Sequence, residues 1–231
     1  MGDRDDDRQP VQAVVFDMDG VLLQSEEVWD EVRERLARER GGHWAAEAHH
    51  RMMGMSAPEW SSYMAGELGV PMAPAAISAE VVARMADRYR ADLPLLPGAV
   101  EAVRRVAARW PLGLASSSNR PLIDLVLELT GLAGSFTATV SSEEVARGKP
   151  APDVYLEVAR RLGVEPERGV AVEDSANGLR SAAAAGMRVV AIPNPGFPPP
   201  PELVRAADVV LDGLDALTTD VVDALARPGG P

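Results

Sequence analysis

The sequence contains no cysteine, which excludes disulfide scaffolds, zinc ribbons and thiol nucleophiles and leaves oxygen and nitrogen as ligand atoms. Basic side chains are also scarce, because 23 lysines and arginines face 35 aspartates and glutamates and give a formal net charge of -12. Such a surface repels polyanions, so we expect no nucleic-acid partner. No apolar run approaches the roughly 18 residues of a membrane span, and the start carries no apolar signal segment, so we expect a cytoplasmic protein with no membrane partner.

The chain is long and apolar enough to fold around a well-buried core, with 231 residues of which 46% are hydrophobic. Its two ends are poor folding material, because residues 1–10 hold four aspartates and residues 227–231 are mostly proline and glycine. We therefore expect disordered tails at 1–10 and 227–231.

Short apolar runs alternate with helical patterns along most of the chain. The apolar runs that we predict as strands cover residues 11–16, 112–115, 136–140, 169–172, 188–192 and 208–211. Glycines at 131, 163 and 186 follow the helical patterns between them, as is typical of helix ends. This alternation predicts an α/β fold with a Rossmann-like parallel sheet.

Residues 25–93 interrupt the alternation, because they contain helix signals and no convincing strand. Ser25 is suited to cap a helix whose first turn holds Glu26 and Glu27, and further helices are predicted over 58–68 and 78–92. We therefore expect an inserted all-helical cap domain at 25–93, with the α/β core formed by 11–24 and 94–226.

Asp17 and Asp19 lie two residues apart at the carboxyl end of the first predicted strand, the edge where open α/β sheets bind their ligands. Two ionised carboxylates at this place repel each other and require a cation, a protonated partner or good solvation. Magnesium suits such a site of oxygen ligands. The alternative is an ordinary turn with two solvated aspartates.

Polar residues also follow three other predicted strands. Ser116, Ser117 and Asn119 precede a helix, where hydroxyls and backbone N–H groups bind phosphate or simply cap the helix. Lys149 lies between a glycine and a proline, and a lone lysine is otherwise a solvated surface residue. Glu173 and Asp174 end another strand, where Asp174 is either a metal ligand or a helix cap.

Together, these four segments resemble, in order and spacing, the four motifs of the haloacid dehalogenase-like superfamily. The segments are FDMDGVL at 16–22, LASSSN at 114–119, GKPAPD at 148–153 and VEDSANG at 172–178. The resemblance spans about 11–225 and is strongest to the subgroup with a helical cap inserted after the first motif, near beta-phosphoglucomutase and small sugar-phosphate phosphatases.

The resemblance implies that Asp17 is the nucleophile that takes the phosphoryl group as an aspartyl-phosphate. Asp19 would protonate the leaving oxygen and then deprotonate the attacking water. Ser116, with Ser117 and nearby N–H groups, would bind the phosphoryl oxygens, and Lys149 would offset negative charge.

The implied cofactor is Mg²⁺. Its ligands would be the Asp17 carboxylate, the Asp19 backbone carbonyl and Asp174, with Glu173 as a further ligand or an anchor. Asn119, in the second motif, is expected to bind the substrate. The metal would reduce the repulsion between the nucleophile and a dianionic phosphate.

The cap departs from the mutase pattern at two positions. Ala57 stands where beta-phosphoglucomutase has an arginine that binds the second phosphate, and Trp29 stands at the place of its cap histidine. These changes favour hydrolysis over phosphate transfer, and they predict that Trp29 and Met55 line an apolar substrate pocket. The alternative is that the apolar residues here are only the core of the cap. They are Met52, Met53, Met55, Trp60 and Met64.

The leading interpretation is a Mg²⁺-dependent phosphatase of a small phosphomonoester, and the alternative is a phosphomutase like beta-phosphoglucomutase. A dehalogenase would lack the aspartate at 19, and a phosphonate hydrolase would need a cap lysine, whereas no lysine precedes Lys149. A dinucleotide-binding module would need G-x-G-x-x-G after a strand, which is absent. A catalytically silent regulatory protein stays open. We expect a small phosphorylated partner, a monomer or weak dimer, and His49 and His50 on the surface.

Overall fold

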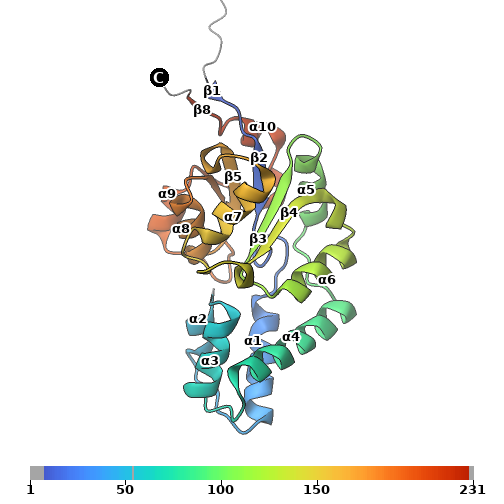
Figure 1. Cartoon of the computed structure of the whole chain (residues 1–231), viewed down its shortest axis with the longest axis vertical. Helices are drawn as coiled ribbons and strands as arrows, with labels where there is room; N and C mark the ends of the chain where they lie inside the picture. Colours follow the sequence, from blue (N-terminus) through green and yellow to red (C-terminus); the bar gives the residue numbers. More distant parts are fainter. Residues whose placement is uncertain (1–7, 54, 229–231) are drawn as a thin grey trace, which may run out of the picture.

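Six parallel strands form the main sheet of the computed structural model, which describes residues 8–53 and 55–228 (Figure 1). In chain order these strands are β2 (Ala13–Phe16), β3 (Leu112–Ser116), β4 (Phe136–Ser141), β5 (Gly169–Glu173), β6 (Arg188–Ala191) and β7 (Val209–Val210). Their spatial order is β4-β3-β2-β5-β6-β7. Strands β3 and β4 are added on one side of β2, whereas β5, β6 and β7 are added on the other side. The connections on the two sides run in opposite directions, so a ligand crevice is expected between the carboxyl ends of β2 and β5. The predicted Rossmann-like α/β core is confirmed.

Helices cover both faces of this sheet. They are α5 (Ala99–Ala107), α6 (Arg120–Thr130), α7 (Asp153–Leu162), α8 (Ala176–Ala184), α9 (Pro201–Ala206) and α10 (Thr219–Asp223). Val15 and Ala171 pack on the face covered by α7, α8 and α9, whereas Val14 and Val172 pack on the face covered by α5, α6 and α10. Because both faces are covered, the central strands β2, β3 and β5 are buried along their whole length, which made them visible in the sequence.

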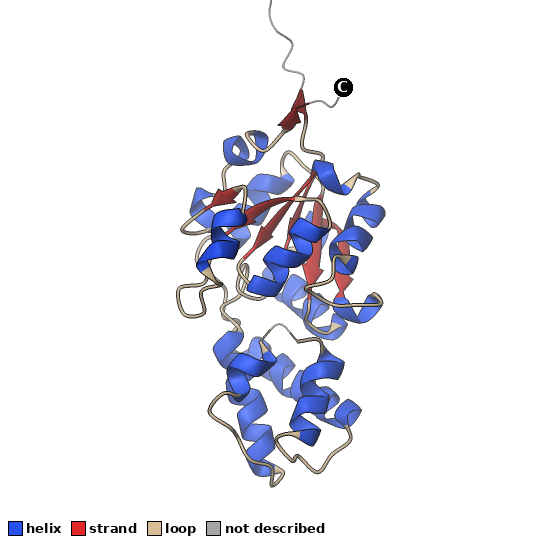
Figure 2. Cartoon of the chain, turned by 90° about the vertical axis from the view of Figure 1, so that its left-hand side faces the viewer, coloured by secondary structure: helices blue, strands red, loops and turns tan. Residues whose placement is uncertain are grey.

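Four helices form a separate layer beyond the carboxyl ends of the strands, and Figure 2 shows that this layer is helical. They are α1 (Glu26–Glu39), α2 (Ala48–Met52), α3 (Ala57–Gly66) and α4 (Pro74–Ala91). Helix α4 begins four residues before the predicted position 78, because Pro74 occupies the first turn, where a missing N–H costs nothing. Helix α2 was not predicted, because five residues are too few for a helical pattern.

The two connections between this helical layer and the core are hydrogen-bonded to each other. The Gln24 N–H donates to the Pro94 carbonyl at 2.8 Å, and the Leu96 N–H donates to the Leu22 carbonyl at 2.9 Å. Between these bonds, Leu23 and Leu95 form an antiparallel bridge. The chain therefore leaves and re-enters the core through one paired strap.

The chain ends differ from the expected tails. Strand β1 (Arg8–Gln9) pairs antiparallel with β8 (Arg227–Pro228), although these residues were expected to be disordered. Backbone groups make this pairing, and composition does not reveal it. The rest of both expected tails, 1–7 and 229–231, lies outside the described residues. Within the described part of the chain, no helix combines the length and the apolar character needed to span a membrane.

Candidate active site

The loop after β2 places Asp17 and Asp19 in the crevice of the sheet. The Asp17 N–H donates to the Val172 carbonyl at 3.0 Å and thereby continues the pairing of β2 with β5. Gly20 has a φ of +86°, and a Cβ at this position would overlap the Asp174 carboxylate. The tight turn therefore needs glycine and brings the acids of two strand ends together.

Lys149, the sole lysine of the chain, lies buried against Asp17 and Glu173. Its Nζ donates to Asp17 Oδ1 at 2.8 Å, to Glu173 Oε1 at 2.5 Å and to the Ala115 carbonyl at 3.0 Å. Burial disfavours the charged amine, but the Asp17 and Glu173 carboxylates outweigh burial and hold the pKa of Lys149 above its usual range. Lys149 is therefore a charged group at Asp17 rather than a solvated surface residue.

Glu173 is fully buried, and several donors bind its carboxylate. Oε1 accepts from Lys149 and from the Tyr155 hydroxyl at 2.6 Å, while Oε2 accepts from the Ser175 hydroxyl at 3.3 Å and the Asp174 N–H at 3.2 Å. These bonds occupy both oxygens. The geometry favours Glu173 as an anchor for Lys149 over a role as metal ligand.

One carboxylate oxygen from each of Asp17, Glu173 and Asp174 lies within 4.8 Å of the other two. The Asp174 Oδ1 is buried and has no hydrogen-bond partner among the described residues. Burial, reinforced by the charges of Glu173 and Asp17, raises the pKa of Asp174 well above its ordinary value. An unpartnered carboxylate oxygen in a cluster of acids fits a hard divalent cation such as Mg²⁺. Asp174 does not cap α8, because Ser175 accepts the Gly178 N–H instead.

Asp19 lies apart from this cluster and is held by hydroxyls and an indole. Its Oδ1 accepts from the Ser25 hydroxyl at 2.5 Å and from Trp29 Nε1 at 3.4 Å. Its Oδ2 accepts from the Ser118 hydroxyl at 2.6 Å and from the Ser116 hydroxyl at 3.5 Å. The prediction that Ser25 caps α1 with its side chain is wrong, because the Asp19 carboxylate takes the hydroxyl as the stronger acceptor.

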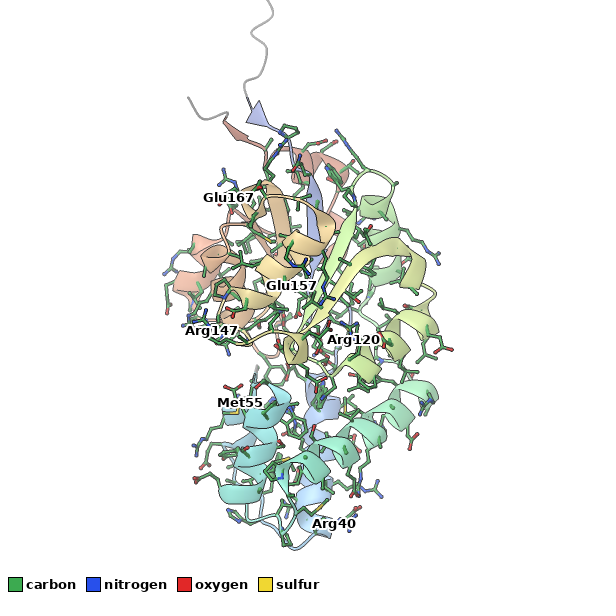
Figure 3. The ribbon with its side chains drawn as sticks, viewed as in Figure 1. Arg40, Met55, Arg120, Arg147, Glu157 and Glu167 are labelled. Atoms are coloured by element: carbon green, nitrogen blue, oxygen red, sulfur yellow. The ribbon has the colours of Figure 1, made fainter. Side chains whose placement is uncertain are left out.

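One cavity between the helical layer and the core joins most of the predicted site residues. It is lined by Asp17, Asp19, Trp29, Met55, Ser117 and Lys149, together with Glu26, Arg33, Trp60, Ser118, Ser175 and Asn177. Figure 3 shows Met55 at the junction of the two layers. Ser116 lies beneath this cavity, where its hydroxyl accepts the Ser118 N–H at 3.0 Å.

Two residues singled out in the sequence lie elsewhere. The Asn119 side chain donates to Glu143 Oε1 at 2.6 Å, and Ala57 and Asn119 both line a different groove, between α3, α4 and the core. His50 is exposed as predicted, whereas His49 is only partly exposed. Its side chain is 14% exposed, with Nδ1 3.1 Å from Asp30 Oδ1 and the ring 4.9 Å from that of Phe197, which comes from a distant loop.

The cavity contains residues that the sequence reasoning did not select. Glu26, Trp29 and Arg33 are spaced so that they share one face of α1. The prediction that Trp29 lines the pocket could therefore have been extended to both charged residues. Ser118 belongs to the LASSSN segment, so the motif itself was a signal for this residue. No local signal distinguishes Tyr155 from other apolar-face residues of α7.

A doubly wound parallel sheet with paired aspartates, a buried lysine and an acidic cluster at its carboxyl edge, covered by a helical layer, has the features of an enzyme active site on a Rossmann-like α/β fold. Residues 11–186 match the family described as haloacid dehalogenase-like hydrolase, and the chain belongs to this family.

Three relatives place the protein within the family. Hexitol phosphatase B of Escherichia coli K12 is 35% identical over 214 residues, which cover 90% of this chain and 95% of that protein. The structure of CbbY from Rhodobacter sphaeroides with phosphate has a TM-score of 0.81 at 27% identity and covers 92% of this chain and 99% of that one. A structure assigned as a candidate beta-phosphoglucomutase from Thermotoga maritima has a TM-score of 0.70 at 28% identity. The match covers 91% of this chain and 98% of that one.

Proposed function

We propose that this protein is a Mg²⁺-dependent phosphatase that hydrolyses a small phosphomonoester through an aspartyl-phosphate on Asp17. The observation that carries the proposal is the buried Asp17–Lys149 pair, which faces the same cavity as the Asp19 carboxylate. The similarity to hexitol phosphatase B over most of both chains supports a phosphorylated carbohydrate or a related small molecule as the substrate.

In the first step, an Asp17 carboxylate oxygen forms a bond to phosphorus while the bond from phosphorus to the ester oxygen breaks. Asp19 donates its proton to the leaving oxygen. Lys149, charged and within 2.8 Å of Asp17, offsets negative charge on the nucleophile and the phosphoryl group. Ser117 and the N–H groups near Ser116 bind the phosphoryl oxygens.

In the second step, Asp19 takes a proton from a water molecule whose oxygen attacks phosphorus, and the bond to Asp17 breaks. Phosphate leaves, and both aspartates return to their starting states. We assign the Mg²⁺ ligands to the carboxylates of Asp17 and Asp174 and the backbone carbonyl of Asp19, with Glu173 as an anchor. When bound, the ion supplies positive charge that reduces the repulsion between a carboxylate and a dianionic phosphate.

A phosphate-release screen over sugar phosphates, nucleotides and small acid phosphates, with Mg²⁺ or with EDTA, tests this function. Turnover is expected only with Mg²⁺, and Asp17→Asn is expected to abolish it. Asp19→Asn should lower turnover by about 10²-fold or more, the usual contribution of general acid–base catalysis. Activity that survives EDTA or the Asp17→Asn change would contradict the proposal.

The alternative function is a phosphomutase, and the similarity to the Thermotoga maritima structure is the observation that supports it. A mutase retains a bisphosphate intermediate and must exclude water from the aspartyl-phosphate. A coupled assay for conversion of beta-glucose 1-phosphate to glucose 6-phosphate, with a bisphosphate activator, separates the two. Robust conversion would replace the phosphatase assignment.

A further inference from the structure

Arg33 is a buried arginine in the wall of the catalytic cavity. It lies on α1, is 7% exposed, and shares the cavity with Asp17 and Lys149. The carbon of its guanidinium lies 4.6 Å from the ring centre of Trp29 and 4.8 Å from that of Trp60. Two aromatic rings therefore hold the guanidinium in place.

The guanidinium of Arg33 has no ion pair and no hydrogen bond within residues 8–53 and 55–228, and its Nε is buried without an acceptor. Other arginines of the same helical layer are more exposed, yet they pair with carboxylates. They are Arg35, Arg38, Arg40, Arg84, Arg88 and Arg90. The most buried of these arginines thus has no carboxylate partner among the described residues.

An unpaired buried charge is costly to the fold, and cation–π contacts offset only a part of that cost. Burial lowers the pKa of Arg33 to about 10, although the Glu26 and Asp30 carboxylates oppose the shift. The group nevertheless stays charged near neutral pH. A cation that is kept charged, oriented and unpaired in a ligand cavity is suited to an anionic ligand.

The position of Arg33 separates it from the phosphate that reacts. Asp17 and Lys149 lie at the sheet edge, whereas Arg33 lies two turns into α1, on the side of the cavity formed by the helical layer. Glu26 lies on the same helix face nearer the core, and no ion pair joins it to Arg33 among the described residues. A group bound at Arg33 therefore belongs to the leaving part of the substrate.

We propose that Arg33 is a specificity residue that binds a second oxyanion, a phosphate or a carboxylate, on the leaving group. This inference rests on the proposed phosphatase function of the same cavity. The planar guanidinium fork matches both oxyanions through two parallel hydrogen bonds, and these bonds would engage donors, the buried Nε among them, that have no acceptor within the described ranges. The preferred substrates are thus small phosphomonoesters whose leaving group carries a further acidic group. Phosphates of polyols without such a group are poorer substrates.

The test compares two pairs of compounds. Glycerol 3-phosphate and 3-phosphoglycerate differ by a carboxylate, and fructose 6-phosphate and fructose 1,6-bisphosphate differ by a phosphate. The wild-type kcat/KM should favour one doubly acidic compound over its partner by roughly 10- to 100-fold, the effect of charge-assisted hydrogen bonds. The pair that shows the preference identifies the oxyanion.

Arg33→Met should abolish this preference by raising the KM of the compound with the second acidic group. It should change the kcat/KM of the compound without that group by less than about threefold. Arg33→Lys, which keeps the charge and loses the fork, should retain a part of it. Arg51→Met is the matched control, because Arg51 also stacks on an aromatic ring, that of Tyr63, but does not line the cavity. This variant should behave as the wild type.

Two further measurements keep the outcomes distinct. Arg33→Met should melt at or above the wild-type temperature, because methionine replaces an unpaired buried charge. If none of the four compounds releases phosphate, calorimetric binding of the same compounds to Asp17→Asn and to Asp17→Asn with Arg33→Met still tests Arg33, whereas the broader phosphate-release screen decides the proposed function. Equal losses on both members of each pair, a wild type without preference, or a fall in melting temperature with equal losses would overturn the inference.

Discussion

Replacing Lys149 with methionine removes the only lysine ammonium group from a cluster of three buried carboxylates. The Nζ of Lys149 contacts Asp17 and Glu173 directly, and Asp174 belongs to the same cluster. The Lys149 side chain is 3% exposed, so water has little access to replace it. Methionine fills a similar volume, and the change therefore tests charge more than packing.

The expected loss of stability is about 3–5 kcal/mol, the cost of removing one partner from a buried ion pair. This loss is a large part of the roughly 5–15 kcal/mol that stabilises an ordinary domain. A cation in the acidic cluster should restore much of it. At a free Mg²⁺ concentration about 100 times the dissociation constant, binding to the folded state returns about 2.7 kcal/mol.

Urea unfolding of the wild type and of Lys149→Met, each with EDTA and with Mg²⁺, measures both effects. Arg147→Met is the control on the same loop, because Arg147 is 71% exposed, points outward in Figure 3 and pairs with Asp153 at 3.0 Å. Its loss should cost less than about 1 kcal/mol. A Lys149→Met variant within about 1 kcal/mol of the wild type in EDTA would refute the view that this ammonium stabilises the acidic cluster.

Two other substitutions test single contacts. Tyr155→Phe removes the 2.6 Å hydrogen bond to Glu173 and should cost about 1–2 kcal/mol in urea unfolding; an unchanged midpoint would show that this bond is dispensable. Glu144→Gln should cost about 1 kcal/mol at pH 7, because hydrogen bonds from Arg120 and Arg161 outweigh partial burial and lower the pKa of Glu144 from 4.5 to about 2. Since the folded-state pKa is lowered, this stability is present above pH 4.5 and disappears toward pH 2, so a difference from the wild type that is equal at pH 7 and pH 3 would contradict it.

The sheet and the gathering of the catalytic residues could be predicted because both follow from local sequence. Strands buried on both faces appear as continuous apolar runs, and all six lie within two residues of their predicted ends. Carboxyl ends of parallel strands share one edge, so Asp17, Lys149 and Asp174 meet although they are distant in sequence. The division of the chain at 25–93 stays a prediction.

The helical layer was harder to predict, because its important contacts join different helices. The surroundings of Arg33 depend on Trp60 of α3, which no pattern within α1 reveals. Ala57 and Asn119 were placed at the substrate by motif position, but their side chains line a different groove. Sequence spacing gives the position of a residue along an element, whereas the cavity that it lines depends on how the elements pack.

The two hydrogen-bonded connections, residues 22–24 and 94–96, form a hinge between the helical layer and the core, and this hinge lies close to Asp19 in the sequence. The two connections are hydrogen-bonded to each other, so we expect the layer to turn about the strap more easily than to shift along it. With a rise of about 1.5 Å per residue, Trp29 lies about 6 Å and Arg33 about 12 Å along α1 from Ser25. A turn of about 20° therefore moves Arg33 by roughly 4 Å and Ser25 hardly at all. We therefore expect that such a turn would separate the core from the Arg33 end of the cavity first, while the hydroxyl of Ser25 still holds Asp19.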